Sequence, residues 1–294
     1  MTLIPNYLKM APRVIASVWR HPANQGRRLR QVAVALTFQI RGRVARRPSP
    51  VPLGRKSRVL AYLDDSSSRK AAYANPPDWP EMHIWMNYLG PGSLFVDVGA
   101  DIGLYTVLAI DAGAEAIAVE PRIEATERLR ENLALNGYSA TIAAVALSSR
   151  AGQAKLAGED ATKHHLVADD PVDNPARIVP VTTLDELLGK RHAHGVKIDV
   201  EGAERLVLIG AALALAEGRI GLLQLEWNFQ SQIVFGEGRE PVEKLLRAYG
   251  YQLFRPDQSG QLNAVSAPAP GRDVFAMRVM GRPAELSYEM PTPE

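Results

Sequence analysis

The chain contains no cysteine, and this absence excludes several kinds of chemistry. Disulfides, thiolate nucleophiles, zinc sites with thiolate ligands and iron–sulfur clusters all require that residue. Long hydrophobic runs are also missing, because no window reaches the roughly 18 apolar residues of a transmembrane helix. No small-residue cleavage site follows the first apolar residues, so we expect no signal peptide. These absences fit a cytoplasmic protein.

Acidic residues are missing from the first part of the chain. Residues 1–63 contain no aspartate or glutamate, but they hold 13 of the 34 lysines and arginines. The remainder has 21 basic and 32 acidic residues, a formal charge of −11. Such a split is typical of a basic appendage on an acidic domain. We therefore predict a basic extension and linker at 1–63, a main domain at 64–282 and a C-terminal tail at 283–294.

In other respects the composition is that of an ordinary globular protein. The 294 residues are 46% hydrophobic and 22% charged, with 23 glycines and 21 prolines. These values exclude a collagen-like, low-complexity or wholly disordered chain. The length is sufficient for one large domain with its own core.

The basic segment contains apolar residues at helical spacing between positions 24 and 42, namely Leu29, Val32, Leu36 and Ile40. We expect one basic amphipathic helix there. It can pack on the main domain, on a second copy of the chain in a homodimer, or on an anionic membrane surface at the inner face of the membrane. Nucleic acid fits poorly, because no aromatic residues alternate with the arginines to stack on bases. We expect a linker at 46–58, which holds three prolines, and a loop at 64–80.

From residue 90 onward, apolar strands alternate with helices. Strands are expected at 94–98, 116–121, 141–147, 196–200, 221–227, 251–254 and 273–279, and helices at 104–112, 123–135 and 239–250. Buried strands separated by helices predict an α/β fold with a doubly wound, mostly parallel sheet. The last two strands are joined by a short loop rich in proline and glycine, so we expect them to pair antiparallel.

The loop after the first strand is the expected centre of a ligand site, because ligands of such sheets lie beyond the carboxyl ends of the strands. Gly99 and Gly103 allow a tight turn here. A dinucleotide-binding loop would also need glycines at 101 and 104, but Asp101 and Leu104 stand there. Together with Asp97, Asp101 repels a phosphate and suits a ligand with an ammonium and a sulfonium. S-adenosylmethionine is such a ligand.

A second acid supports a nucleoside ligand. Glu120 ends the second strand, 21 residues after Gly99, where a carboxylate can bind both hydroxyls of a ribose. Ribose recognition fits NAD and S-adenosylmethionine equally, and the acidic loop favours the latter. The complete predicted cofactor site consists of Asp97, Gly99, Ala100, Asp101, Gly103, Tyr105, Glu120, Pro121, Ala146 and Asp199.

Several segments together resemble the FkbM family of class I methyltransferases. They are FVDVGADIGLYT (95–106), AVEP (118–121), VALSSRAG (145–152), VPVTTLDELL (179–188), VKIDVEGAE (196–204) and LLQLEWN (222–228). The resemblance extends from about Tyr73 to Tyr251. It implies a Rossmann-like, seven-stranded sheet with an antiparallel last strand, S-adenosylmethionine as donor, and O-methylation of a sugar, glycan or secondary-metabolite hydroxyl. The chain departs from the family loop GANxG in having Asp101 in place of the asparagine.

Acidic residues follow the expected fourth and fifth strands. Asp199 and Glu201 are candidates for binding the methionine amine of the cofactor or for orienting the acceptor. Glu204 is expected only to begin the next helix, where an acid is favourable. Asp199, Glu226 and Asn228 form an oxygen-rich set that could hold Mg²⁺, as in catechol-type methyltransferases. The FkbM family is not defined by a metal, so we expect no metal here, and these three residues are the candidates if one binds.

Methylation of an alcohol needs a base, because its proton must leave as the methyl group arrives. His165 in ATKHHLV (161–167) is our candidate, and it aligns with a T-x-N-H-V segment of related family members. His192 and His194 precede the fourth strand, at the wrong end of the sheet. We therefore predict an O-methyltransferase with a small-molecule or glycan acceptor. The alternative is a non-catalytic cofactor-binding scaffold whose basic arm binds a membrane surface or a partner.

Overall fold

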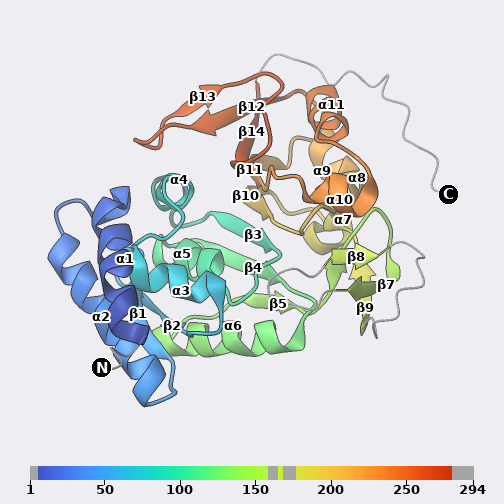
Figure 1. The fold of residues 1–294 in the computed structure, drawn as a ribbon. Coiled ribbons are helices and arrows are strands. Elements are labelled where there is room, and N and C mark those ends of the chain that lie inside the picture. The colour runs from blue at the N-terminus through green and yellow to red at the C-terminus, as the bar shows by residue number, and fades with distance from the viewer. Residues whose placement is uncertain (1–5, 158–164, 168–176, 280–294) are drawn as a thin grey trace.

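The computed structural model describes residues 6–157, 165–167 and 177–279. Its largest sheet contains β3 (Leu94–Val98), β4 (Glu115–Val119), β5 (Thr141–Ala143), β10 (Ala193–Ile198), β11 (Ile220–Leu225), β12 (Tyr251–Pro256), β13 (Leu262–Ala264) and β14 (Val274–Arg278). The eight strands lie in the order β13-β12-β14-β11-β10-β3-β4-β5 (Figure 1). The strands β5, β4, β3, β10 and β11 are mutually parallel, and β14 lies antiparallel between β11 and β12. The predicted doubly wound sheet with an antiparallel last strand is confirmed, and β13 adds an unpredicted eighth strand at one edge.

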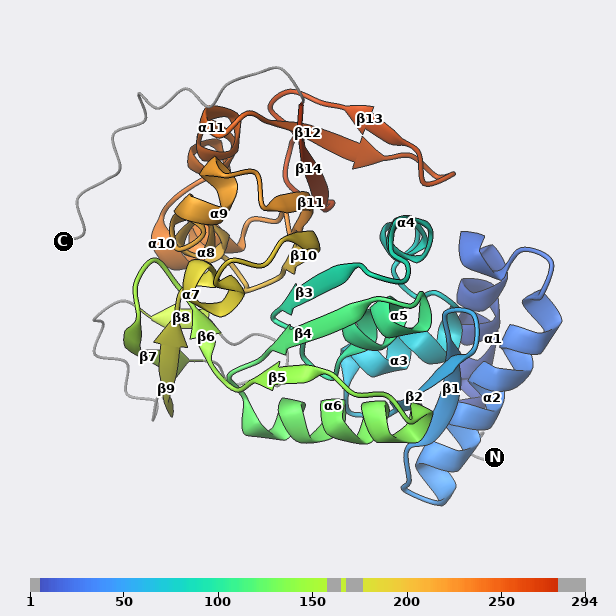
Figure 2. The same ribbon diagram turned by 180° about the vertical axis from the view of Figure 1, so that it is seen from behind.

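Helices cover both faces of this sheet (Figures 1 and 2). They are α4 (Glu81–Tyr88), α5 (Leu104–Asp111), α6 (Ile123–Asn136), α7 (Leu184–Leu188), α8 (Glu204–Ile209), α9 (Ala212–Ala216), α10 (Gln230–Phe235) and α11 (Glu240–Ala248). Along β3, Leu94, Val96 and Val98 pack with α7, α8, α9 and α11, whereas Phe95 packs with α4, α5 and α6. This period-two alternation gives the sheet two buried faces, as the continuous apolar strands predicted.

The predicted strand at 141–147 divides at a bend into β5 and β6 (Ala146–Leu147). The strand β6 turns away from the main sheet and joins β7 (Gly152–Ala157), β8 (His165–Val167) and β9 (Arg177–Thr182) in a second sheet of order β6-β9-β7-β8. The second sheet was not predicted, because a run of seven mostly apolar residues does not reveal that its two halves pair with different strands.

The N-terminal segment is more ordered than its composition predicted. It contains α1 (Asn6–Arg20), a 3₁₀ turn (Pro22–Asn24), α2 (Arg28–Val44), β1 (Ser49–Leu53), β2 (Ser57–Ala61) and α3 (Ser66–Tyr73). The expected linker at 46–58 is therefore wrong, since β1 and β2 form an antiparallel hairpin there. Prolines fit in β1 because it pairs with β2 alone and its other edge needs no N–H donors. The expected loop at 64–80 contains α3, whose N-terminus is capped by the Asp65 side chain accepting from Ser68 N.

The hairpin belongs to the same core as the sheet. The side chains of Val51, Leu53 and Val59 are buried in one apolar cluster with Phe95. The Asp111 carboxylate of α5 accepts hydrogen bonds from the N–H groups of residues 55 and 56, at 2.6 and 3.1 Å, and from the residue 57 hydroxyl at 2.7 Å. The core of the main domain thus includes residues on the N-terminal side of the boundary predicted at 63/64.

The helix α2 packs on this body through a face that the sequence did not indicate. Its buried residues are Gln31, Ala35 and Phe38, and Leu29 and Ile40 of the predicted apolar face are 77% and 61% exposed. Packing on the main domain, one of the alternatives for this helix, is therefore observed. No helix in the described part of the chain combines the length and hydropathy needed to cross a bilayer.

Candidate active site

A cavity lies beyond the carboxyl ends of β3, β4 and β10, and we call it the first cavity. Seven of the predicted site residues line it: Gly99, Asp101, Glu120, Pro121, Ala146, Asp199 and Glu201. Asp97, Ala100 and Gly103 are buried behind its wall. Tyr105 lines a neighbouring cavity instead. The predicted set is thus brought to one end of the sheet, as the rule for open α/β sheets requires.

The loop from Gly99 to Gly103 is shaped by backbone conformation and close packing. Gly99 has φ +79°, and a Cβ atom built on it would lie 1.8 Å from the carbonyl oxygen of Asp199. Only glycine therefore lets the loop approach the end of β10. Asp101 has φ +49°. Asparagine and aspartate are the side chains that best tolerate this left-handed region, so Asp101 suits the position.

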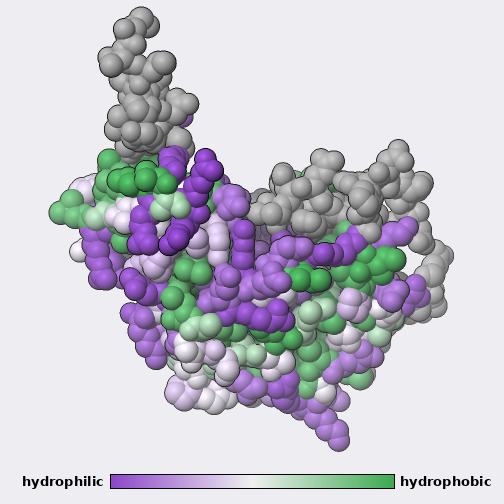
Figure 3. Space-filling model, turned by 90° about the horizontal axis from the view of Figure 1, so that it is seen from below, coloured by the Kyte–Doolittle hydropathy of each residue, from purple (hydrophilic) through white to green (hydrophobic). Residues whose placement is uncertain are grey.

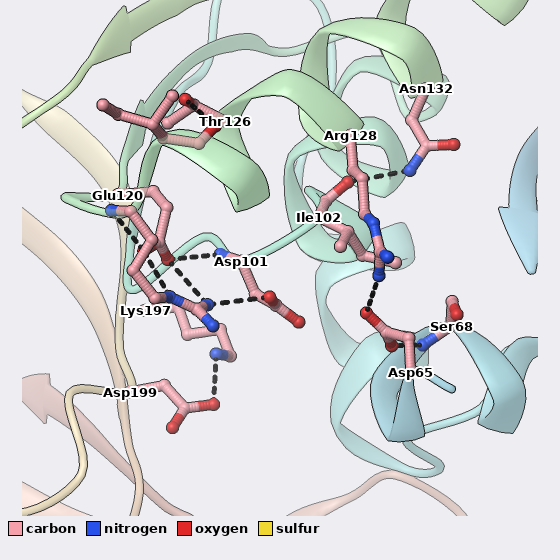
Figure 4. Close-up of polar contacts among 12 residues, drawn as sticks. Asp65, Ser68, Asp101, Ile102, Glu120, Thr126, Arg128, Asn132, Lys197 and Asp199 are labelled. Carbon is pink, nitrogen blue, oxygen red and sulfur yellow. Dashed lines mark hydrogen bonds and ion pairs between the residues drawn. The ribbon is translucent and has the colours of Figure 1, made fainter. Parts of the chain in front are cut away.

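Glu120 is held by Arg122, which was not among the predicted site residues. Glu120 also contacts Asp101 (Figure 4). The carboxylate is 3% exposed, and one of its oxygens accepts from Arg122 N at 3.0 Å and Nε at 2.8 Å. Its other oxygen accepts from Asp101 N at 2.9 Å and from Arg122 Nη2 at 3.3 Å. Arg122 Nη2 also binds Asp101 Oδ1 at 2.8 Å. A ribose that binds Glu120 would replace hydrogen bonds that Arg122 makes to this carboxylate. The only sign of these bonds in the sequence is the presence of an arginine two residues after the predicted acid.

The charge of Arg122 is well stabilised. Burial alone would lower the pKa of its guanidinium, but the Glu120 and Asp101 carboxylates outweigh burial and raise it. Burial raises the pKa of Asp101, and Arg122 partly offsets that effect. The acids of the first cavity are thus compensated by a cation within the protein.

A second charged group lies on the strands below the loop. Lys197 faces Asp97 across β3 and β10, and its Nζ donates to Asp199 Oδ2 at 2.7 Å. Burial raises the pKa of Asp97, while Lys197 and a 2.7 Å hydrogen bond from the Thr106 hydroxyl lower it. For Lys197, the unfavourable effect of burial is outweighed by Asp199 and Asp97, so its pKa is raised. Its Nζ also lies 4.6 Å from the centre of the Tyr105 ring, a cation–π contact.

A second cavity of about 460 Å³ adjoins the first, and Asp199 lines both. Its volume is within the range typical of small-molecule sites. The walls come from the segment 77–81, the ends of β10 and β11, the turn after β12 and the residues before β14. At its base, Gln224 Nε2 donates to Asp273 Oδ2 at 2.6 Å and to the Tyr105 hydroxyl at 3.2 Å. Burial and the charge of Asp199 raise the pKa of Asp273 to about 7.

A sequence profile of the Methyltransferase FkbM domain matches residues 97–253, more than half of the chain. The chain belongs to the FkbM methyltransferase family. Its methyl donor is therefore S-adenosylmethionine, and the first cavity, with its glycine loop and Glu120, fits the nucleoside of that donor. A search of curated proteins gives no significant match.

Solved structures resemble this FkbM methyltransferase only weakly. A Streptococcus mutans protein described as a methyltransferase, in complex with S-adenosylhomocysteine, is 10% identical, with 68% of this chain and 96% of that chain covered and a TM-score of 0.41. A Pyrococcus horikoshii protein described as an RNA methyltransferase is 15% identical, with 86% and 98% covered and a TM-score of 0.40. A ribosomal protein L11 methylase of Lactobacillus delbrueckii is 14% identical, with 67% and 77% covered and a TM-score of 0.38. At these values the likeness assigns no acceptor.

The carboxyl groups after β10 and β11 do not form the set Asp199, Glu226 and Asn228 that the sequence offered as the candidate metal ligands. Oxygens of Asp199, Glu201 and Glu226 lie within 4.8 Å of one another. Asn228 takes no part, because its Oδ1 accepts from Gln230 N at 2.8 Å and from Arg239 Nη2 at 2.9 Å. Burial, together with the charges of Asp199 and Glu201, raises the pKa of Glu226 to about 10. Glu226 is therefore protonated at neutral pH.

Glu204 does more than begin α8, which was its only expected role. Its side chain is fully buried and forms an ion pair with Arg239, and one of its oxygens accepts from Gly202 N at 3.1 Å. The pair joins the end of the KIDVEGAE motif to the segment after β11, 35 residues away. The sequence did not reveal this role, because no local pattern links the two partners.

The candidate histidines lie on different elements. His165 begins β8, and its backbone pairs with Ala157 of β7. Its side chain lies outside the described part of the chain, so its role as base stays a prediction. His194 Nδ1 accepts from Leu94 N at the start of β3, at the end of the sheet away from Asp199, as expected.

Gly99→Ala is expected to destabilise the enzyme by roughly 2–4 kcal/mol, because the methyl group meets the Asp199 backbone in a left-handed conformation. Gly236→Ala is the matched control, since Gly236 has φ +68° but open space around it. It should cost only about 1–2 kcal/mol. Urea unfolding of the three proteins measures the difference. Equal losses for the two variants would show that the contact with Asp199 does not matter.

Proposed function

We propose that this FkbM methyltransferase is an O-methyltransferase that modifies a hydroxyl of a sugar, glycan or secondary metabolite. The observation that carries this proposal is the meeting of two cavities at Asp199. The first cavity has the donor-binding features. The second cavity has the size of a small-molecule site and a wall of hydrogen-bonding side chains, which suits an acceptor with several hydroxyls.

The chemistry requires alignment and one proton acceptor. The donor supplies an electrophilic methyl group. As the acceptor oxygen forms its bond to this carbon, the carbon–sulfur bond breaks and the hydroxyl proton passes to a base. Holding the acceptor in line removes orientational entropy and contributes several kcal/mol. Asp199 and Glu201 orient the reacting groups at the junction of the cavities, and His165 is the base in our proposal.

Glu120→Gln is expected to weaken binding of S-adenosylhomocysteine by about 1–3 kcal/mol, because a charged acceptor of ribose hydrogen bonds is lost. Calorimetric titration of the purified full chain measures this, with NAD as a ligand that should not bind. Glu124→Gln is the control, since Glu124 is exposed and pairs with Arg177 on the outside of the protein. Unchanged affinity in Glu120→Gln would remove Glu120 from the cofactor site.

His165→Ala is expected to lower kcat for hydroxyl methylation by about 10²–10⁴-fold while leaving the affinity for S-adenosylhomocysteine unchanged. The assay follows transfer of a labelled methyl group to a panel of sugars, glycans and hydroxylated natural products. His192→Ala serves as the control at the far end of the sheet. A rate that does not change in His165→Ala would refute its role as base, and binding of the donor product without transfer to any hydroxyl would favour the scaffold alternative.

We also propose that the protein works in the cytoplasm, at the inner surface of the membrane. The support comes from α1 and α2, where Trp19, Leu29, Ile40 and Val44 are 44%, 77%, 61% and 81% exposed. Arginines lie among them, and hydrophobic and hydrophilic residues adjoin on this side of the molecule (Figure 3). Exposed apolar side chains beside cations suit an anionic lipid surface.

The membrane proposal is tested by flotation of the full chain with vesicles. We expect binding to phosphatidylglycerol vesicles and little to phosphatidylcholine vesicles, with several-fold weaker binding of the double variant Leu29→Ser, Ile40→Ser. Ile178→Ser is the control, because Ile178 is 64% exposed on β9. Equal binding to both lipids would contradict the proposal. A change of sedimentation mass in the double variant without vesicle binding would instead indicate that this face joins two copies in a homodimer.

A further inference from the structure

The second cavity is lined by more acids than bases. Its acidic residues are Asp78, Glu81, Asp199, Glu226, Asp257 and Asp273, and its basic residues are Lys70, Lys197 and Arg272. Two of the three bases are already paired, Lys197 with Asp199 at 2.7 Å and Lys70 with Asp78 at 3.6 Å. The third, Arg272, is exposed. Because Glu226 is protonated at neutral pH, the acids left over are Glu81, Asp257 and Asp273, and the remaining base is Arg272. The lining therefore has more carboxyl groups than cations to pair with them.

The excess matters because several of these acids are shielded from water. Burial raises the pKa of Glu81, and the nearby Arg272 only partly offsets this. Burial is also the main cause that raises the pKa values of Glu226 and Asp273. A carboxylate in such surroundings is costly unless a cation accompanies it. In the first cavity Arg122 fills that role through ion pairs. In the second cavity Arg272 and Lys197 only partly offset the burial of Glu81 and Asp273, and neither acid forms an ion pair with a described side chain.

Hydrogen-bonding groups in the wall are also left available. Oxygen Oε2 of Glu226 is buried without a partner among the described residues. Tyr105 is 7% exposed, and its hydroxyl accepts from Gln224 while no described group accepts its hydrogen. Trp79 lines the same cavity, with its indole N–H held by the carbonyl of residue 258 at 2.9 Å. An aromatic face beside acceptors for N–H donors matches a ring that carries both hydroxyl and ammonium groups.

We propose that the acceptor is an amino sugar or aminocyclitol, whose protonated amine binds the carboxylates of the second cavity while one of its hydroxyls faces the methyl group beside Asp199. This inference rests on the proposed O-methyltransferase function and specifies its substrate class. Lys197 and Asp199 neutralise each other at the junction, so the remaining acids act on the distal part of the acceptor. Phosphorylated sugars and uronic acids are disfavoured, because their charge has the same sign as the wall.

The experiment titrates the full chain, saturated with S-adenosylhomocysteine, with matched ligand pairs. Glucosamine, galactosamine and 2-deoxystreptamine are each compared with their N-acetylated forms, and glucuronate is included. We expect at least one amine to bind about tenfold or more tightly than its N-acetyl partner, and glucuronate to bind weakest. The preference should shrink as salt is raised, because ions screen the attraction. Failure of every amine to exceed its N-acetyl partner would overturn the inference.

A variant tests which carboxylate is responsible for the preference for the amine. Glu81→Gln should reduce the preference for the amine several-fold, because it removes one carboxylate of the wall. Glu115→Gln, an exposed acid at the opposite end of the sheet, should leave the preference unchanged. An equal preference in wild type and Glu81→Gln would show that the amine binds elsewhere and would overturn the assignment to this cavity. If Glu81→Gln does not fold, the comparison of ligand pairs on the wild-type chain still decides the question.

The two proposals fail in different ways. Transfer of methyl to neutral hydroxyl compounds with no advantage for amines would overturn the substrate class and leave the O-methyltransferase function intact. Tight binding of an amine without transfer to any hydroxyl would overturn the function while supporting the cavity's charge preference. Mass spectrometry and NMR of the product identify the methylated atom, and methylation on nitrogen would contradict the proposed placement of the hydroxyl.

Discussion

The buried ammonium of Lys197 connects the cofactor side of the site with the acceptor side. It donates to Asp199, faces Asp97 across the strand pair, and contacts the ring of Tyr105. Without this cation, the buried carboxylate of Asp97 and the partly exposed carboxylate of Asp199 would repel each other where charge is poorly screened. Because Asp199 lines both cavities, its orientation depends on Lys197. The lysine of the KIDVEGAE motif therefore has an electrostatic role in the interior of the sheet, and it helps to position Asp199 where the two cavities meet.

The features predicted from the sequence are those encoded within a few neighbouring residues. Gly99, Gly103 and Asp101 define a tight loop after an apolar strand, and Glu120 follows the next strand at a fixed interval. The main-sheet strands named in the sequence analysis and the helices at 104–112, 123–135 and 239–250 were predictable for the same reason, since apolar periodicity is a local property. The antiparallel last strand came from the family resemblance, and the structure confirms it.

The features that were missed depend on partners far apart in the chain. Glu204 pairs with Arg239, and Gln224 joins Tyr105 to Asp273 across separations of 119 and 49 residues. Neither link has a sequence signal, because it exists only after the sheet has formed. The N-terminal region was misjudged for a related reason. The prolines of this region indicated a linker, but β1 has one edge without a partner strand, and that edge tolerates proline. The apolar side chains of β1 are buried against the main-sheet domain.

The distribution of compensating cations separates the roles of the two cavities. Lys197 is buried and Arg122 is partly buried, and both are paired with acids that line the first cavity. Such internal ion pairs suit a ligand that carries both positive and negative charges, because the charges of the site are already balanced before the ligand binds.

The second cavity lacks an equivalent ion pair for Glu81, Glu226 and Asp273 among the described residues. Burial raises the pKa of each of these groups, so their ionised forms are disfavoured while no cation is bound. An incoming ammonium changes that balance, since it stabilises the ionised forms and gains charge-assisted hydrogen bonds in return. Selectivity for a cationic acceptor thus follows because these carboxyl groups of the second cavity have no ion-pair partner within the protein. The first cavity is stable without a ligand because its carboxylates are paired with Arg122 and Lys197.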